Sequence, residues 1–247
     1  MEYIHISKSN NKPYPDCVIL VEHPSVYTLG RGGTPENIKF NTMSKDSRVY
    51  RVSRGGEVTW HGPGQLVAYP IIDLTEHKKD LRWYITKLEE SVIRTLHSCG
   101  IVGGRSDVNP GVWIGNRKVC AVGVAASRWI TMHGLALNVT CDLSPYNSIV
   151  PCGISPDIGG VTSMAAEVSV LPAEKRWCGN EINEHSPKER LFYLQVKARL
   201  TEYFMDEFNF EGEHSSVTEL DRLLTASSVD IQNDELQVVQ GNTSERI

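Results

Sequence analysis

The sequence predicts an α+β domain in which a mixed, largely antiparallel sheet is flanked by helices. Short apolar runs alternate with turn residues along the first part of the chain, and several of them are joined by hairpin-like turns. Two long stretches carry helical periodicity instead. Because hairpins join antiparallel neighbours, these observations favour this class over a doubly wound parallel sheet.

The strands are predicted from short apolar runs. Four runs precede the first helix: Cys17–Val21, Val26–Leu29, Val49–Val52 and Leu66–Ile72. Further along, Gly115-Asn116 is a two-residue hairpin signal between two more strands. A last strand, Trp129–Val139, is expected to be interrupted at His133-Gly134.

Two amphipathic helices are predicted. The first follows Asp80, a favourable N-cap residue, and ends at Gly100. Its apolar residues recur at helical spacing: Leu81, Tyr84, Ile85, Leu88, Val92, Leu96 and Cys99. The second begins at the capping box Ser186–Glu189 and continues to about Phe208. Its expected apolar face consists of Phe192, Val196, Leu200 and Tyr203.

Residues 1–210 are predicted to form a single domain, and residues 211–247 an acidic, flexible tail. The tail holds eight acidic and two basic residues, a net charge of −6, against −5 for the whole chain. At the other end, Met1–Pro15 is polar and is expected to be loose. The core of the fold is therefore expected between these two segments.

Composition argues against several classes of protein. No apolar run approaches the ~20 residues that a membrane helix needs. No stripe of Lys and Arg with interleaved aromatics indicates nucleic-acid binding. The six cysteines include no CxxC pair, so zinc-type spacing is absent, and no metal site is expected. Their scattered placement suits reduced thiols, and Cys120, inside an apolar strand, is expected to be buried.

The most informative stretch is Arg54–Leu74, RGGEVTWHGPGQLVAYPIIDL. It places an arginine before two glycines, and a histidine in a Gly/Pro-rich turn between two strand-like runs. Glycines allow the backbone to approach a ligand closely, and loops concentrate ligand-contacting residues. Pattern alone fits a simple hairpin with a tight turn equally well.

Four blocks together resemble the lipoyl(octanoyl) transferases, the octanoyl-[acyl-carrier-protein]:protein N-octanoyltransferase family. They are Glu22–Arg31, Arg54–Gln65, Arg117–Gly123 with His133–Val139, and Ile149–Ile154. The blocks follow the family's order, and the resemblance covers about residues 15–164. It implies the fold shared by biotin protein ligases and lipoate ligases, with an acyl channel on a mixed sheet.

The resemblance implies a Lys–Cys dyad, with Cys152 as the nucleophile and Lys118 beside it. A thiol accepts an acyl group as its thiolate, which requires a lowered pKa. A nearby ammonium favours the thiolate. Lys118 follows the predicted Gly-Asn turn directly, so it begins a strand and points to one fixed face. Without the resemblance, a lone Lys there indicates a solvated charge and a lone Cys a packing residue.

Three segments match the family's substrate-contact segments, with His133 added beside the third. These residues are Arg54, Gly55, Gly56, Glu57, Val58, Thr59, Trp60 and His61; Ala121, Val122 and Gly123; His133, Gly134, Leu135 and Ala136. Small residues there leave room for an eight-carbon chain, and backbone N–H groups stabilise a thioester oxyanion. His61 and His133 are equally compatible with structural and catalytic roles, and Asn138 is expected to be structural.

The implied reaction moves octanoate from octanoyl-acyl carrier protein to Cys152, and then to a lysine of a lipoyl domain. The acceptors are the lipoyl domains of 2-oxoacid dehydrogenase complexes or the glycine cleavage H protein. No cofactor is implied, because the donor is already a thioester. No membrane or nucleic-acid partner is expected. The location is expected to be mitochondrial in a eukaryote and cytoplasmic in a bacterium, and no targeting segment is visible in this sequence.

A basic excess between Arg31 and Arg54 has two interpretations. This stretch contains two acidic residues and six basic ones, which are Arg31, Lys39, Lys45, Arg48, Arg51 and Arg54. They form either a solvated loop surface or a docking patch for an acidic partner.

Three rival functions remain compatible with parts of the pattern. The first is an ATP-dependent lipoate ligase of the same fold, against which the Pro-Cys-Gly thiol argues. The second is a hydrolase that pairs Cys152 with His61 or His133. The third is a catalytically dead binding protein that keeps the fold, against which the intact Lys118 and Cys152 argue.

Overall fold

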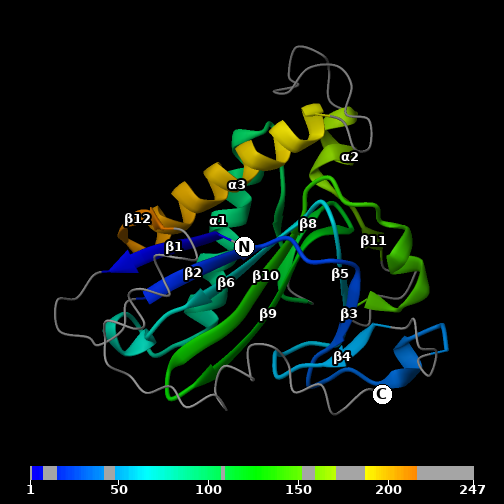
Figure 1. The fold of residues 1–247 in the computed structure, drawn as a ribbon, viewed down its shortest axis with the longest axis horizontal. Coiled ribbons are helices and arrows are strands. Elements are labelled where there is room, and N and C mark those ends of the chain that lie inside the picture. The colour runs from blue at the N-terminus through cyan, green and yellow to red at the C-terminus, as the bar shows by residue number, and fades with distance from the viewer. Residues whose placement is uncertain are drawn as a thin grey trace.

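The computed structural model describes residues 2–7, 16–41, 48–106, 109–151, 159–170 and 187–215 (Figure 1). The main sheet runs in the order β12-β1-β2-β6-β10-β9-β8-β7, and β11 pairs with β9. A second sheet has the order β4-β3-β5. All pairs are antiparallel except β9 with β11 and β3 with β4. The predicted α+β class with a mixed, largely antiparallel sheet is therefore confirmed.

The elements have the following bounds. The strands are β1 Glu2–Ser7, β2 Asp16–Val21, β3 Val26–Leu29, β4 Val49–Arg51, β5 Val58–His61, β6 Gln65–Ile71, β7 Gly104–Arg105, β8 Gly111–Ile114, β9 Arg117–Ser127, β10 Ile130–Asn138, β11 Gly160–Val161 and β12 Glu211–Ser215. The helices are α1 Leu81–Ser98, α2 Met164–Ser169 and α3 Pro187–Phe208, and short 3₁₀ turns occur at Pro35–Asn37, Leu74–Glu76 and Ser144–Ser148.

Helix α1 begins and ends as its sequence predicts. The Asp80 carboxylate accepts hydrogen bonds from the N–H groups of Arg82 and Trp83, which satisfies two of the free donors at the helix start. At the other end, Gly100 takes a positive φ of 77°, a conformation that favours glycine. The buried side of α1 packs on the main sheet together with α3, and all three share one core cluster.

Helix α3 ends at Phe208 as predicted, and its start lies beside Ser186, which is outside the described residues. Phe192, Val196 and Leu200 are buried as expected. Tyr203 is only half-buried, and the core position belongs to Phe204. The prediction for Tyr203 was wrong because the four-residue spacing of the buried face continues from Leu200 to Phe204, whose ring packs against Phe208 with centroids 4.6 Å apart.

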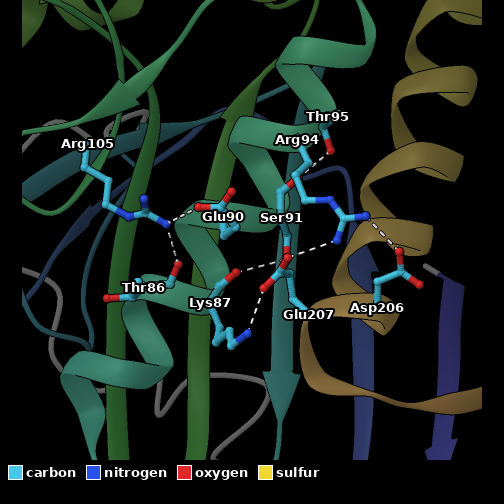
Figure 2. A network of polar contacts seen from close by, with 9 residues as sticks. All are labelled: Thr86, Lys87, Glu90, Ser91, Arg94, Thr95, Arg105, Asp206 and Glu207. Atoms are coloured by element: carbon cyan, nitrogen blue, oxygen red, sulfur yellow. Dashed lines mark hydrogen bonds and ion pairs between the residues drawn. The ribbon is translucent and has the colours of Figure 1, made fainter.

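Ion pairs join α1 to the end of α3 at the surface (Figure 2). The Arg94 guanidinium contacts Asp206 at 2.8 Å and Glu207 at 2.9 Å, and Lys87 contacts Glu207 at 2.9 Å. Arg94 also lies over the Tyr203 ring, 4.5 Å from its centroid, which gives this half-buried tyrosine its role. These exposed and half-exposed pairs fix the register of two helices whose attachment comes mainly from the core beneath them.

Three sequence-based expectations for the strands were wrong. First, His61 was expected in a loop; the alternative of a simple β5–β6 hairpin does not occur either, because β5 pairs with β3 in the small sheet and β6 with β2 and β10 in the main one. The tight turn exists, since the Gln65 N–H donates to the Gly62 carbonyl. This turn connects a strand of the small sheet to a strand of the main sheet. Apolar periodicity does not reveal which sheet a strand joins. His61 consequently ends a strand rather than occupying a loop.

The second error concerns β10, which is continuous through His133-Gly134. Gly134 pairs with Gly123 and His133 with Val124, so the strand continues although His133 has a positive φ of 60°. The third concerns the polar N-terminus, where β1 pairs with β2 and β12. The strand was missed because its alternating residues Ile4 and Ile6 stand at the start of a longer segment that is polar as a whole.

The single domain of residues 1–210 and the tail of residues 211–247 stay a prediction. Strand β12 shows that pairing in the main sheet extends five residues beyond residue 210. Helix α2 was missed because it has only six residues. Its N-cap is Ser163, whose hydroxyl accepts from the Ala166 N–H.

Candidate active site

The three predicted substrate-contact segments lie side by side in the structure. The second and third are neighbours in the main sheet, where Ala121 pairs with Ala136 and Gly123 with Gly134. The first lies across β9, because the Gly55 N–H donates to the Val124 carbonyl at 2.9 Å. Three segments from distant parts of the sequence thus form one surface.

Two glycines make this contact possible. A Cβ on Gly123 would lie 3.1 Å from both the Arg54 Cδ and the Gly55 carbonyl. A Cβ on Gly30 would lie 2.3 Å from the Gly56 carbonyl, closer than any real contact. The absence of side chains at these positions lets the Arg54–Glu57 loop pack between β9 and the end of β3.

Arg54 fixes this loop in place. Its guanidinium is buried and donates to the Thr28 carbonyl and hydroxyl, both at 2.8 Å, and to the Gly55 carbonyl at 3.0 Å. Charge-assisted bonds of this kind are among the stronger ones in proteins. The charge therefore serves to hold the loop on β3. The Gly55 N–H, a candidate oxyanion donor, is engaged by Val124.

The residues from Glu57 to Trp60 are mostly buried. Val58 and Trp60 join the second core cluster, together with Tyr146 and Ile149. The Trp60 indole N–H donates to the Ser25 hydroxyl at 2.9 Å, and the Asn37 amide donates to the Glu57 carboxylate at 3.1 Å. These side chains support the wall of the surface; a direct contact between them and a substrate stays a prediction.

His61 is buried and neutral. Its Nδ1 contacts Gln65 Oε1 at 2.8 Å, and its Nε2 contacts the Thr28 hydroxyl at 3.3 Å. Burial lowers the pKa of His61 to about 3, opposed by the Gln65 hydrogen bond and reinforced by the nearby Arg54 charge. Both ring nitrogens already have partners, so the geometry favours the structural of the two roles left open by the sequence.

His133, whose backbone has a positive φ, contacts the chain just before Arg54. Its Nε2 contacts the Ser53 hydroxyl at 3.1 Å, and its ring meets Tyr69 edge-on with centroids 6.2 Å apart. Tyr69 in turn contacts His23 Nε2 through its hydroxyl at 2.8 Å. Burial lowers the pKa of His133 and of His23, and raises the pKa of Tyr69 to about 12. Tyr69 was missed because it lies in an apolar strand.

A buried hydrogen-bond network connects this surface to β11. The Gln65 amide donates to Asn138 Oδ1 at 2.9 Å and to the Tyr146 hydroxyl at 3.0 Å. The Asn138 amide donates to the Thr162 carbonyl at 2.9 Å, and the Thr162 N–H donates to the Lys118 carbonyl at 3.0 Å. The structural role expected for Asn138 agrees with this position, and Gln65 and Thr162 are network members that the pattern did not identify.

Lys118 lies at the start of β9 and is 4% exposed. Its ammonium lies over the Trp113 ring, 4.8 Å from the centroid. In the sheet, the Lys118 backbone pairs with Val161 of β11. The strand after the Cys152 segment therefore runs directly beside Lys118.

Cys152 and residues 153–158 lie outside the described residues. The chain before them is anchored where Ile149 pairs with Ile38, and the Val150 N–H donates to the Asn37 carbonyl. The chain after them returns at Gly159–Val161 beside Asn116–Lys118. That Cys152 and Lys118 lie close together stays a prediction.

Three of the other described cysteines are poor nucleophiles. Burial raises the pKa of Cys17 to about 11 and that of Cys141 to about 12, and it raises the pKa of the fully buried Cys120 further. Cys120 is buried as predicted. Among the described residues, no cluster of His, Cys, Asp and Glu is arranged to hold a metal ion, and no helix is long and apolar enough to cross a membrane.

The basic run near the small sheet is partly engaged in backbone contacts. Arg31 donates to the Ser53 carbonyl at 2.7 Å, Arg51 to the Gly33 carbonyl at 3.3 Å, and Lys39 to the Asn147 carbonyl at 3.4 Å. Lys45 lies outside the described residues. Both interpretations of the run remain open.

The fold is that of the lipoate–protein ligases. A lipoate-protein ligase A structure bound with ATP superposes with a TM-score of 0.59, at 13% identity, over 85% of this chain and 80% of that one. An archaeal bipartite lipoate protein ligase from Thermoplasma acidophilum has a TM-score of 0.59 at 16% identity, over 86% and 81% of the two chains. At these identities the similarity concerns the fold alone.

Sequence comparison identifies the family. The family model of the lipoyl protein ligase A/B catalytic domain matches residues 1–176, and the chain belongs to this family. A chloroplastic octanoyltransferase of Arabidopsis thaliana is 56% identical over 145 residues, which are 58% of this chain and 52% of that protein. An octanoyltransferase of Nostoc punctiforme is 46% identical over 182 residues, 70% of this chain and 79% of that protein.

A third relative, an octanoyltransferase of Synechococcus elongatus, is 49% identical over 149 residues, 60% of this chain and 64% of that protein. The chain thus spans only about half to two-thirds of the Arabidopsis and Synechococcus relatives. The resemblance noted in the sequence is confirmed at the level of the octanoyltransferase family.

Proposed function

We propose that the protein is an acyltransferase, which moves an octanoyl group from octanoyl-acyl carrier protein through a Cys152 thioester to a lysine of a lipoyl domain. Membership in the family and relatives named octanoyltransferases support the reaction class. The observation that supports it most is the meeting of three substrate-contact segments on β9, the strand that also bears the buried Lys118.

In the first step, the Cys152 thiolate attacks the thioester carbonyl of the donor. The new carbon–sulfur bond forms as the bond to the carrier's sulfur breaks, and the Lys118 ammonium gives its proton to the leaving thiolate. The products are S-octanoyl-Cys152, a neutral Lys118 amine and the free carrier thiol. Covalent catalysis divides a difficult transfer into two easier exchanges.

In the second step, the neutral amine of the acceptor lysine attacks the acyl-enzyme. An amide bond forms, the bond to Cys152 breaks, and the Lys118 amine accepts the proton lost by the incoming nitrogen. The thiolate and the ammonium are thereby restored. No ATP or cofactor takes part, because the donor arrives as a thioester.

The partners follow from this reaction, with lipoyl domains of 2-oxoacid dehydrogenases or the glycine cleavage H protein as acceptors. An acidic carrier protein fits the basic run at Lys39, Lys45, Arg48 and Arg51. Charge reversal at Lys45 and Arg48 should slow acylation by the carrier-bound donor much more than by a small octanoyl thioester. Equal slowing with both donors would refute docking at this run.

The compartment is also a proposal. A mitochondrial location in a eukaryote and a cytoplasmic one in a bacterium remain the expectation, and the chloroplastic Arabidopsis relative adds the plastid. Imaging a tagged full-length protein in the source cell decides among the three; a secreted protein would refute all of them.

The test is the intact mass of the protein after incubation with octanoyl-acyl carrier protein. The proposal predicts an added octanoyl group on Cys152, which disappears when a lipoyl domain is added and reappears on the acceptor's lysine. Cys152→Ala should form no adduct, whereas Cys120→Ala and Cys141→Ala should still form it. An adduct that persists in Cys152→Ala would mean that another thiol is the nucleophile.

The same experiment separates the rival functions. The solved neighbours include lipoate ligases, one of them bound with ATP, and transfer that requires ATP would favour that chemistry for this chain. Release of free octanoate without an acceptor would favour a hydrolase. A folded protein that binds the donor but forms no adduct would be a binding protein that keeps the fold.

A further inference from the structure

Trp113 contacts the functional group of Lys118 directly. The Lys118 ammonium lies 4.8 Å from the centroid of the indole ring, within the ~6 Å range at which the negative face of an aromatic ring attracts a cation. Trp113 is 8% exposed and Lys118 is 4% exposed. The contact is thus shielded from water, where such an attraction is strongest.

A β-bulge produces this contact. Trp113 pairs with Lys118, but the preceding residue Val112 pairs with Cys120, so Val119 is an extra residue in β9. Val112, Val119 and Cys120 all belong to the core that includes α1. Because neighbouring residues on a strand face opposite sides, Trp113 and Lys118 lie together on the side of the sheet away from that core.

The space for the lysine stem comes from Gly111. A Cβ on this glycine would lie 3.5 Å from the Lys118 Cε and 2.4 Å from the Cys120 carbonyl. Gly111 also has a φ of 128°, a conformation that side chains rarely adopt. Strand β8 therefore supplies an open position for the stem at Gly111 and an aromatic face for the ammonium at Trp113.

The buried carboxylates that pack near this part of the sheet are engaged elsewhere. Glu89 on α1 accepts from the Gly111 N–H at 2.8 Å and pairs with Arg105 at 3.2 Å. Glu167 on α2 pairs with Arg117 at 2.9 Å and accepts from the Thr162 hydroxyl. Each carboxylate thus has a basic partner other than Lys118.

This arrangement has a chemical consequence. A buried ammonium needs a compensating partner, and a carboxylate in that place would neutralise its field. A ring face holds the cation without adding a full negative charge. The field of the ammonium then remains available to stabilise a neighbouring thiolate.

We infer that Trp113 is a positioning residue for Lys118, whose indole face holds the buried ammonium in the orientation that serves the Cys152 thiol. This inference rests on the proposed function and adds to it a residue outside the three substrate-contact segments and the dyad. Trp113 acts through Lys118 and through no contact with the acyl group.

The experiment compares Trp113→Phe and Trp113→Leu with wild type, and uses Trp83→Leu as the matched control. Trp83 is a partly buried tryptophan on α1 that packs against Phe208, in the helical part of the core. The readouts are the pH dependence of Cys152 alkylation by iodoacetamide, single-turnover octanoyl transfer, and the NMR shift of the Lys118 ε-methylene protons, which a ring face moves upfield.

Trp113→Leu should move the midpoint of Cys152 alkylation upward by about one pH unit, which corresponds to about tenfold less thiolate below the midpoint. It should also abolish the upfield shift of the Lys118 protons. Trp113→Phe should retain the NMR shift and most of the alkylation profile, and Trp83→Leu should leave both unchanged. If Trp113→Leu does not fold, a tetrafluorinated tryptophan at position 113 keeps the shape, removes the negative ring face, and should give the same midpoint change.

An unchanged alkylation midpoint in Trp113→Leu and in the fluorinated protein would overturn the inference. So would a changed preference for acyl length with an unchanged midpoint, because Trp113 would then line the acyl channel. If wild type forms no octanoyl adduct, the proposed function fails, while the NMR shift and the alkylation midpoint still decide the role of Trp113.

Discussion

The two faces of the main sheet are held by different kinds of contact. The face that carries α1 and α3 is apolar and aromatic, with Tyr84, Phe192, Phe204 and Phe208 in one cluster. The opposite face carries glycines in close contact with a loop, a buried arginine, and a network of amides and histidines. Dispersion and apolar burial stabilise the first, whereas directional hydrogen bonds determine the geometry of the second.

This difference predicts that substitutions on the helical face affect mainly the stability of the fold, whereas substitutions on the opposite face affect the reaction as well. A cavity in the helical core should lower the free energy of unfolding without moving the site. Loss of a polar contact on the opposite face should alter the reaction beyond its effect on stability. The predictions below test that separation, from the largest expected effect to the smallest.

Phe192→Ala should destabilise the protein most. Phe192 is fully buried on α3, and truncation of such a side chain costs about 3–5 kcal/mol through lost burial and a cavity. Urea unfolding measures the loss. At temperatures where the variant is folded, its Cys152 alkylation profile should match wild type, and a displaced profile would show that the two faces are coupled.

Asn138→Ala should cost stability and activity together. It removes the donor to the buried Thr162 carbonyl, at about 1–3 kcal/mol, and one of the acceptors of the Gln65 amide, which keeps the Tyr146 hydroxyl and the Trp60 carbonyl. Because the Thr162 N–H donates to the Lys118 backbone carbonyl, octanoyl transfer should fall by more than the unfolded fraction explains. Transfer that falls only in proportion to the folded fraction would restrict Asn138 to a role in stability.

His61 should make the protein sensitive to mild acid. Its pKa is lowered to about 3 by burial, so below the ordinary value near 6.5 the unfolded state binds a proton that the folded state resists. Its contribution to stability is fully present above pH 6.5 and is lost as the pH falls toward 3, with a slope of at most about 1.4 kcal/mol per pH unit.

Urea unfolding at pH 7 and pH 4.5 measures this effect in wild type and in His61→Asn. The wild type should lose more stability between the two pH values, because asparagine does not titrate. An equal loss in both proteins would assign the acid sensitivity to other groups, such as His23 and His133.

Thr201→Val should have the smallest effect, and a favourable one. The Thr201 hydroxyl is buried without a hydrogen-bond partner among the described residues. It lines an apolar pocket with Leu20, Leu135 and Phe204, beneath α3. Removing an unpaired hydroxyl at constant shape should raise stability by about 1 kcal/mol, measured as a higher urea midpoint. A lower midpoint would reveal a partner for this hydroxyl and weaken the description of the helical face as purely apolar.

The helical face could be predicted well from the sequence, and the site face only in part. Helix ends and helix faces depend on local signals, such as the caps at Asp80 and Gly100 and the spacing of Phe192 and Val196. The predicted bounds of α1 and α3 are therefore close to the observed ones. The passage from β5 to β6 between two sheets depends on long-range pairing, and alternation of side chains does not reveal it.

The site residues show the same limit. The glycine-rich loop and the strand positions near Lys118 were identified by resemblance, and the structure brings these segments together. Gln65, Tyr69 and Trp113 were not identified as site residues, because each resembles an ordinary strand residue. Their roles depend on which side chains lie opposite, and a bulge at Val119 decides one of those pairings.

The most direct test of the account is the pH dependence of Cys152 alkylation beside single-turnover octanoyl transfer, in wild type, Lys118→Arg and Lys118→Met. Arginine keeps the charge but gives up no proton, so Lys118→Arg should alkylate readily at neutral pH and transfer octanoate poorly. Methionine offers neither charge nor proton, so Lys118→Met should lose both properties. If Lys118→Met alkylates with the wild-type pH profile, Lys118 does not activate Cys152, and the proposed dyad is wrong for this protein.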